Sequence, residues 1–150
     1  MKKLTACLLT AITLTMAAPV MAQFSKPENA IKYRQSAMFM MSQNFGRVAG
    51  MAAGRIPFDA KVAADSAAVA ELMSKLPWAG FVAGTDLGKT KAKPEIWTNR
   101  AKFDDYAKKM QAEMSQLAVA AKSGNLDSIK LAVKATGAAC ESCHDDFQLN

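Results

Sequence analysis

The stretch Cys140-Glu141-Ser142-Cys143-His144 decides how the rest of the chain is interpreted. It holds the only histidine and two of the three cysteines. The spacing Cys-x-x-Cys-His is the attachment signature of haem c, in which two thiols bond to the vinyl groups of the porphyrin. The adjacent imidazole then serves as the proximal ligand of the iron. The motif therefore predicts one covalent haem c, with Cys140 and Cys143 as its anchors and His144 on the iron.

Three other uses of this motif are weighed against haem attachment. A structural zinc site needs further cysteine or histidine ligands, which the sequence lacks. A thioredoxin-like redox pair needs a βαβ context, and no β-alternation is visible. A disulfide between Cys140 and Cys143 would close a ring too small to constrain the unfolded chain usefully. Haem attachment remains the interpretation that uses all three side chains.

The first 22 residues have the pattern of a secretory signal peptide. Lys2 and Lys3 precede an apolar run over residues 4–16, and small residues before Gln23 favour cleavage after Ala22. The apolar run is too short for a membrane anchor. We expect residues 23–150 to form one domain, exported to the periplasm, where haem is attached to motifs of this kind.

The charge of the mature chain is mildly basic and evenly spread. Without Lys2 and Lys3 it has 17 basic and 13 acidic side chains, a formal charge of +4. No block of like charges interrupts the sequence, so a nucleic-acid partner is not expected.

Four segments of the mature chain carry apolar residues at alternating steps of three and four, the spacing of one helical face. The second of these segments, around residues 62–76, is rich in alanine, which permits close approach of helices. The four faces are Ile31, Arg34, Met38, Met41, Phe45 and Val48; Val62, Ser66, Val69, Met73 and Leu76; Ile96, Arg100, Phe103, Ala107, Met110, Met114, Leu117 and Ala121; and Leu126, Ile129, Val133, Thr136, Cys140, Cys143 and Phe147. This pattern predicts an all-α fold, an antiparallel four-helix bundle with the haem between facing helices.

Local signals indicate where each predicted helix begins and ends. Residues 25–28 read as a capping box, Asp59 and Asn125 as N-caps, Pro94 as the start of the third helix, and Gly124 as its stop. Residues 78–93, rich in glycine and lysine, are expected to form the one long loop. On the fourth helix Cys140, Cys143 and His144 share one face, which places all three toward the interior of the bundle.

A ligand for the opposite face of the iron has to come from upstream of the motif. Seven methionines lie in the mature chain, at positions 38, 40, 41, 51, 73, 110 and 114. Met38 is distinguished by Arg34, one turn earlier on the same face, because a core-facing guanidinium needs an anion and a haem propionate supplies one. Met38 would then face the iron. Alternatively, Arg34 extends to solvent and Met38 is core packing. Met41 is the next candidate ligand, and Arg100 a weaker candidate for the propionate.

Several short motifs, in order along the whole mature chain, resemble those of the cytochrome c′ family, the class II cytochromes c. They are Pro27-Glu28, Ile31-Lys32-Tyr33-Arg34-Gln35-Ser36-Ala37, Phe45-Gly46-Arg47, Leu76-Pro77-Trp78, Pro94-Glu95-Ile96-Trp97 and the haem motif. The resemblance implies a periplasmic monohaem four-helix bundle, usually a homodimer. It also implies that Arg34 and Gln35 lie beside the haem edge.

Two positions depart from the usual pattern of that family. The position matching Met38 is typically an apolar residue that does not bind iron, and the position matching Gln148 is typically arginine or lysine. A thioether at the first position is similar to the low-spin cytochromes c-556 and c-554 of the same class, which carry electrons.

Two functions follow from these observations. The main expectation is an electron carrier in which Met38 binds the iron and an unidentified redox protein is the partner. The alternative is a five-coordinate cytochrome c′ that binds small gases, NO or CO. An enzyme such as a peroxidase is not expected, because no second histidine is available as a distal acid or base.

Overall fold

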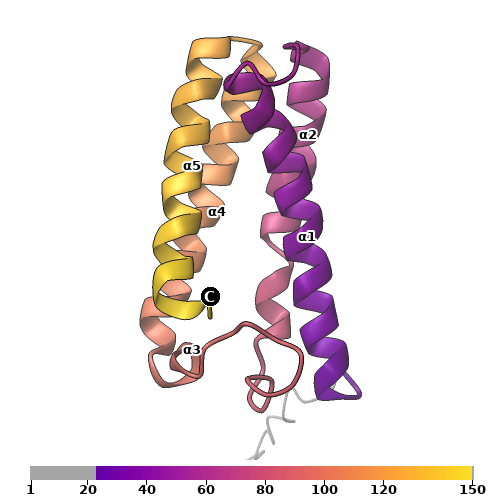
Figure 1. Cartoon of the computed structure of the whole chain (residues 1–150), viewed down its shortest axis with the longest axis vertical. Coiled ribbons are helices and arrows are strands. Elements are labelled where there is room, and N and C mark those ends of the chain that lie inside the picture. The colour runs from indigo at the N-terminus through magenta and orange to yellow at the C-terminus, as the bar shows by residue number, and fades with distance from the viewer. Residues whose placement is uncertain (1–22, 150) are drawn as a thin grey trace, which may run out of the picture.

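Four long helices run antiparallel to their neighbours in sequence: α1 (Pro27–Ala52), α2 (Ala60–Ser74), α4 (Arg100–Ser123) and α5 (Leu126–Phe147) (Figure 1). The computed structural model describes residues 23–149, so the predicted signal peptide lies outside the described residues. Each helix packs against the next along the chain, and α5 returns to α1. The predicted all-α four-helix bundle is confirmed. No helix of the described part is long and apolar enough to span a membrane.

Most of the predicted helix ends are confirmed by their hydrogen bonds. The side chain of Asp59 accepts from the Val62 amide at 2.9 Å, and that of Asn125 accepts from the Ser128 amide at 2.9 Å. Gly124 ends α4 with a left-handed φ of 69°. These caps satisfy backbone groups that the helices themselves leave unpaired.

The predicted capping box at the start of α1 is wrong. The N-cap is Lys26, and no side chain caps the helix there. The Ser25 hydroxyl instead accepts from the side-chain amide of Asn29 at 3.2 Å. Pro27 explains how the helix starts without a side-chain cap, because it has no N–H to satisfy and its φ is already helical.

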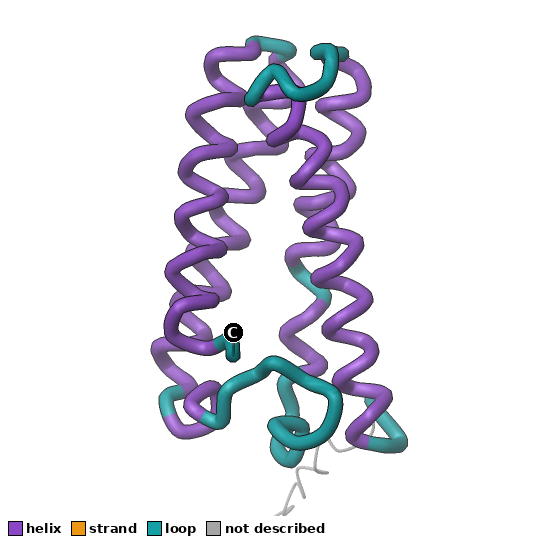
Figure 2. Tube along the Cα trace, in the orientation of Figure 1, coloured by secondary structure: helices purple, strands orange, loops and turns teal. Residues whose placement is uncertain are grey.

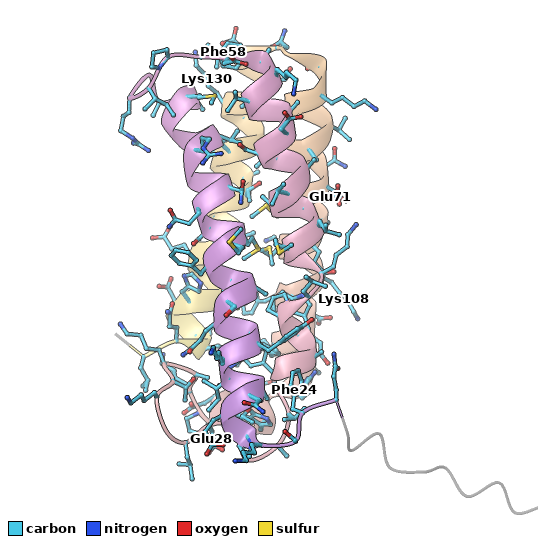
Figure 3. All side chains as sticks on the ribbon, turned by 90° about the vertical axis from the view of Figure 1, so that its right-hand side faces the viewer. Phe24, Glu28, Phe58, Glu71, Lys108 and Lys130 are labelled. Carbon is cyan, nitrogen blue, oxygen red and sulfur yellow. The ribbon has the colours of Figure 1, made fainter. Side chains whose placement is uncertain are left out.

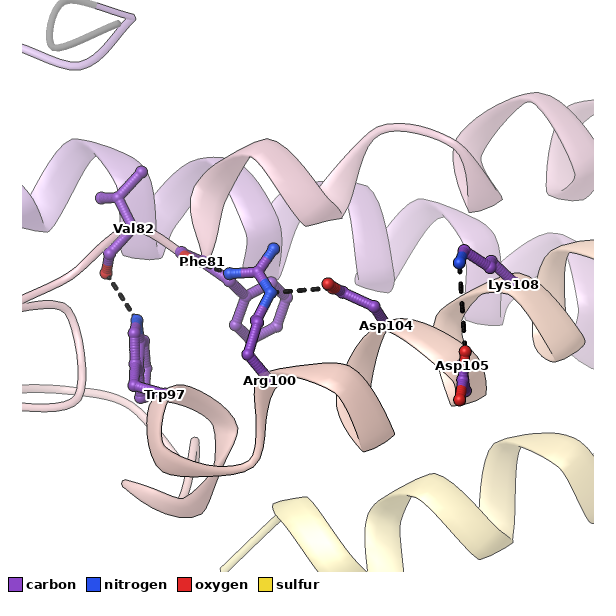
Figure 4. Close-up of polar contacts among 7 residues, drawn as sticks. All are labelled: Phe81, Val82, Trp97, Arg100, Asp104, Asp105 and Lys108. Atoms are coloured by element: carbon purple, nitrogen blue, oxygen red, sulfur yellow. Dashed lines mark hydrogen bonds and ion pairs between the residues drawn. The ribbon is translucent and has the colours of Figure 1, made fainter. Parts of the chain in front are cut away.

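The predicted third helix is two helices. The one-turn α3 (Glu95–Thr98) ends at Asn99, whose φ of −123° and ψ of 51° are not helical, and α4 follows directly. The break allows residues on both sides of it to bond to the preceding loop. The indole of Trp97 donates to the Val82 carbonyl at 3.0 Å, and Arg100 donates to the Phe81 carbonyl at 3.2 Å (Figure 4).

The buried face of α2 differs from the predicted face by one position. Val62 is 37% exposed, and small side chains take its place in the core. The buried residues of α2 are Ala63, Ser66, Ala67, Ala70 and Ser74. Small residues let α2 pack close to α1 and α4. The gain from this close packing exceeds the gain that burying Val62 would give. On α4 the predicted face is buried from Phe103 to Ala121, whereas Arg100 is exposed.

A loop over residues 81–94 crosses one end of the bundle, the same end at which α5 finishes (Figure 2). It follows a turn of 3-10 helix, η1 (Pro77–Gly80). Ala92 forms an antiparallel bridge with Gln148. On either side of this bridge, the Leu149 amide donates to the Lys91 carbonyl at 2.8 Å and the Lys93 amide donates to the Phe147 carbonyl at 3.0 Å. The loop is thereby fixed to the end of α5.

Candidate functional site

A cavity of about 560 Å³ lies between α1, α4, α5 and the loop, within the volume range of cofactor sites. Cys140, Cys143 and His144 all line it, as do Met38, Arg34 and Gln35. All six residues that the sequence assigned to a haem site therefore meet at one place. The other lining residues are Phe39, Met41, Ser42, Phe45, Trp78, Phe81, Thr90, Lys91, Ala92, Ile96, Phe103, Tyr106, Met110, Met114, Phe147 and Gln148.

The two cysteines are free and half-buried on the wall that α5 provides, and His144 is exposed at its edge. Burial raises the pKa of the Cys140 thiol. It also raises the pKa of Cys143 to about 11, with smaller contributions from Cys140 and Asp146. A redox-active cysteine pair would require the opposite, a lowered thiol pKa. The environment of the thiols therefore does not favour the thioredoxin-like alternative.

The zinc alternative also lacks ligands. Over residues 23–149 no group of three or more histidine, cysteine, aspartate and glutamate side chains lies close enough together to hold a metal ion. The cysteines are not joined in a disulfide either. Of the interpretations given for the motif, haem attachment is the one that fits the cavity.

Four thioethers line the same cavity, two from α1 and two from α4. Met41, Met110 and Met114 are buried, whereas Met38 is half-buried and packs against the same core cluster. Figure 3 shows sulfur atoms gathered between the helices near the middle of the bundle. Met38 is thus part of the cavity wall, as predicted. Whether its sulfur binds the iron stays a prediction.

Arg34 is only 3% exposed, so the alternative in which it extends to solvent is wrong. One terminal nitrogen donates to the Gly80 carbonyl at 2.9 Å and the Thr85 hydroxyl at 2.6 Å. The other donates to the Thr85 carbonyl at 2.6 Å and the Thr90 hydroxyl at 2.8 Å. The guanidinium also lies 4.6 Å from the ring centre of Phe81.

The electrostatic position of Arg34 follows from these contacts. Desolvation lowers the pKa of the guanidinium, and the charge of Asp86 opposes this shift. An anion was expected beside this buried cation, but its partners here are neutral acceptors of η1 and the loop and an aromatic face. The predicted contact between Arg34 and a haem propionate stays a prediction.

The other two polar candidates also bond to the loop. Gln35 donates to the Lys89 carbonyl at 2.9 Å. Arg100, the weaker candidate for a propionate, is not part of the cavity wall. Its guanidinium pairs with Asp104 at 2.8 Å and with the Phe81 carbonyl, as Figure 4 shows.

An aromatic wall is the part of the site that sequence reasoning missed. Phe103 is its centre, with its ring 4.8 Å from Phe81, 5.7 Å from Trp78 and 5.4 Å from Phe147, in edge-to-face contacts. Tyr106 adjoins Phe147, and its hydroxyl donates to Asp146 at 2.8 Å. The faces at helical spacing included Phe103 and Phe147. Trp78 and Phe81 come from a segment without regular period. Trp78 belongs to the family-like motif Leu76-Pro77-Trp78, but no pattern assigned either residue to the site.

The cavity suits a flat apolar cofactor attached to α5. Its walls are mostly thioether, aliphatic and aromatic, and none of its lining residues is an aspartate or glutamate. The attachment motif lies on one wall, and cationic side chains offer partners for an anionic edge. An antiparallel helical bundle with such a cavity and motif is the architecture of a c-type monohaem cytochrome.

Comparison with known proteins identifies the family within that class. The family model described as Cytochrome C' matches residues 29–148. The chain belongs to the cytochrome c′ family, whose members hold one covalent haem c, and this chain holds one as well. A cytochrome c′ from Rubrivivax gelatinosus is 50% identical over 127 residues, which cover 84% of this chain and 98% of the relative.

Two further comparisons bear on the iron ligands. The nitric oxide complex of a variant cytochrome c prime from Alcaligenes xylosoxidans has a TM-score of 0.80 and 39% identity, covering 85% of this chain and 99% of that one. A cytochrome c-554 from Cereibacter sphaeroides is 33% identical over 146 residues, covering 92% of this chain and 94% of the relative.

Proposed function

We propose that this protein is a periplasmic, five-coordinate cytochrome c′ that binds small neutral gases, NO or CO, at its haem iron. Cys140 and Cys143 anchor the haem by thioether bonds, and His144 is the proximal iron ligand. This differs from our main expectation of an electron carrier. The comparisons support the change, because relatives at 50% and 40% identity are cytochromes c′, whereas the cytochrome c-554 relative is more distant at 33%.

The observation that carries the proposal is the wall that α1 gives to the cavity. Met38, Met41 and Phe45 line it with apolar side chains. Beyond Arg34, α1 adds no charged side chain to this wall, so a charged ligand beside Met38, Met41 and Phe45 would lose its solvation without compensation, whereas a small neutral molecule would not. The known nitric oxide complex of a relative supports this ligand class.

The same wall does not favour an enzyme. Peroxide chemistry on haem uses a distal acid or base, and the only histidine of the chain is already assigned to the proximal side. We therefore propose reversible binding without chemical turnover. An unidentified redox protein would be needed to keep the iron ferrous.

Met38 is the observation that favours the second candidate, an electron carrier. Its side chain lines the cavity, and a thioether bound to iron would limit rearrangement between the oxidation states. The two functions differ in one coordination bond. One spectroscopic experiment therefore separates them.

The test is the absorption spectrum of the purified ferric and ferrous protein, compared with that of Met38→Leu. A gas-binding protein is expected to be high-spin in both states, to bind CO readily, and to keep its spectrum in the variant. Met41→Leu is the matched control, a second thioether of the same wall. A low-spin spectrum that becomes high-spin only in Met38→Leu would establish the electron-carrier function instead.

We also propose that the mature protein, from Gln23 onward, is a homodimer. The family resemblance implies it, and α1 carries exposed apolar side chains, Phe39 at 60% and Met40 at 46% exposure. Sedimentation of the holoprotein tests this proposal. A monomer at all concentrations would contradict it.

A further inference from the structure

The charged side chains of the cavity wall are all basic. They are Arg34 and Lys91, and none of the lining residues is acidic. Haem c has two propionate groups, which are carboxylates at neutral pH. The wall is therefore complementary to the anionic edge of the cofactor. Either Arg34 or Lys91 could contact a propionate.

Arg34 is already committed to the loop. Both of its terminal nitrogens make two hydrogen bonds each, so all four of their N–H groups are in use and only the Nε–H is left for a further acceptor. Turning the guanidinium toward a propionate would leave the buried carbonyls of Gly80 and Thr85 without a donor, which is costly. Arg34 is thus better described as the residue that holds the loop in place.

Lys91 has the opposite properties. Its backbone is fixed, because its carbonyl accepts from the Leu149 amide and the next residue forms the bridge to Gln148. Its side chain is exposed and lines the cavity. Of the ion pairs found among residues 23–149, none includes Lys91. A positioned backbone with an ammonium group that has no carboxylate partner is suited to an anion at the cavity edge.

We propose that Lys91 is the partner of a haem propionate, and that Arg34 acts indirectly by pinning the loop that carries Lys91. The propionate contact that was predicted for Arg34 is thus assigned to Lys91, and Arg34 holds the loop instead. This inference rests on the haem of the proposed function, but it is independent of whether the iron binds a gas or Met38.

The test compares Lys91→Gln with Lys89→Gln in the holoprotein. Lys89 is also an exposed cation of the same loop, but it is not part of the cavity wall. The reduction potential is measured as a function of pH. Lys91→Gln should lower the potential, because a nearby cation disfavours the more positive ferric state. It should also raise the pKa of the propionate that titrates with the potential, because a cation favours the carboxylate form.

Lys89→Gln should leave both quantities unchanged, and Lys91→Arg should restore them. Equal changes in Lys91→Gln and Lys89→Gln would mean a general charge effect, and no change in either would mean no contact; each result overturns the proposal. The visible spectra of the same samples report the coordination of the iron separately. A failure of the gas-binding proposal is therefore distinguishable from a failure of this one.

Discussion

Gly80, the last residue of η1, illustrates how closely this short helix packs on α1. A Cβ atom at this position would lie 2.7 Å from the Ala30 carbonyl oxygen and 2.9 Å from the Cβ of Arg34. Neither is the end of a flexible side chain, so backbone has to move. We expect Gly80→Ala to lower the free energy of unfolding by about 1–3 kcal/mol, measured by urea denaturation.

The control for this substitution is Gly46→Ala in the interior of α1, where an added Cβ meets nothing within 4 Å. Alanine there should stabilise the protein by about 1 kcal/mol through helix propensity. If both substitutions stabilise the protein, the close approach at Gly80 is not as described.

Arg34 gives the second prediction at this scale. Arg34→Met retains an apolar stem but leaves the Gly80 and Thr85 carbonyls without their donor, at about 1–3 kcal/mol for each buried acceptor. We expect lower stability and faster amide hydrogen exchange over residues 81–93, with the haem still attached. Arg100→Met is the control, because its exposed pair with Asp104 contributes at most about 1 kcal/mol. Equal effects of the two substitutions would contradict the role given to Arg34.

Among the helices, Glu71 links α2 to α4. Its carboxylate accepts from Lys75 at 2.9 Å on the same helix and from the Ser115 hydroxyl at 3.1 Å on α4. The bond from Lys75 is the main reason that the pKa of Glu71 is lowered, and the bond from Ser115 adds to it. A lowered pKa of a carboxyl group means that its contribution to stability is present above its unfolded value, about 4.3, and is lost as the pH falls through the lowered value.

We therefore expect Glu71→Gln to reduce the urea midpoint at neutral pH and to match the unsubstituted protein in strong acid. Asp65→Asn is the control on the same helix, since the pair of Asp65 with Lys61 is exposed and stays within α2. A difference between Glu71→Gln and the unsubstituted protein that persists unchanged at low pH would exclude the carboxylate as its cause.

Helix ends that are set by local bonds could be predicted from the sequence, whereas features set by the packing of other elements could not. Asp59, Asn125 and Gly124 act through bonds to their own neighbours, so the sequence was sufficient to place them. Val62 was assigned to the core by its hydrophobicity, but small residues such as Ala63 are buried instead, and this depends on the distance to α1. The break at Asn99 accompanies bonds from Trp97 and Arg100 to carbonyls 15 and 19 residues earlier, in the loop that precedes α3. Periodicity contains neither kind of information.

For the whole molecule, the cavity couples folding to the cofactor. A void of about 560 Å³ in a domain of this size is costly to maintain without an occupant. Cys140→Ala combined with Cys143→Ala should give a colourless product with reduced helicity and a lower melting temperature, followed by circular dichroism. Ser142→Ala, within the same motif, should remain coloured and folded. Full helicity with undiminished thermal stability in the double variant would contradict this coupling.

The site as a whole was only partly predictable. Cys140, Cys143, His144 and Met38 came from one short motif and one helical face, which are local signals. The partners of Arg34 lie 46 to 56 residues later in the chain, at the end of η1 and in the loop after it, where the sequence has no regular spacing. A guanidinium on an apolar face indicates that a partner exists, but not whether it is a carboxylate or a set of carbonyls. Lys91 could not be singled out among its neighbouring lysines for the same reason.

The burial of Arg34 has a consequence for how the protein responds to its medium. Dissolved ions screen exposed charges over about 8 Å at physiological ionic strength, but they cannot approach a buried one closely. Arg34, at 3% exposure, therefore gives the cavity a positive potential that persists in concentrated salt. The contribution of the exposed Lys91 diminishes under the same conditions. The affinity of the haem iron for an electron is thus expected to have a contribution from Lys91 that decreases with salt concentration and a contribution from Arg34 that does not.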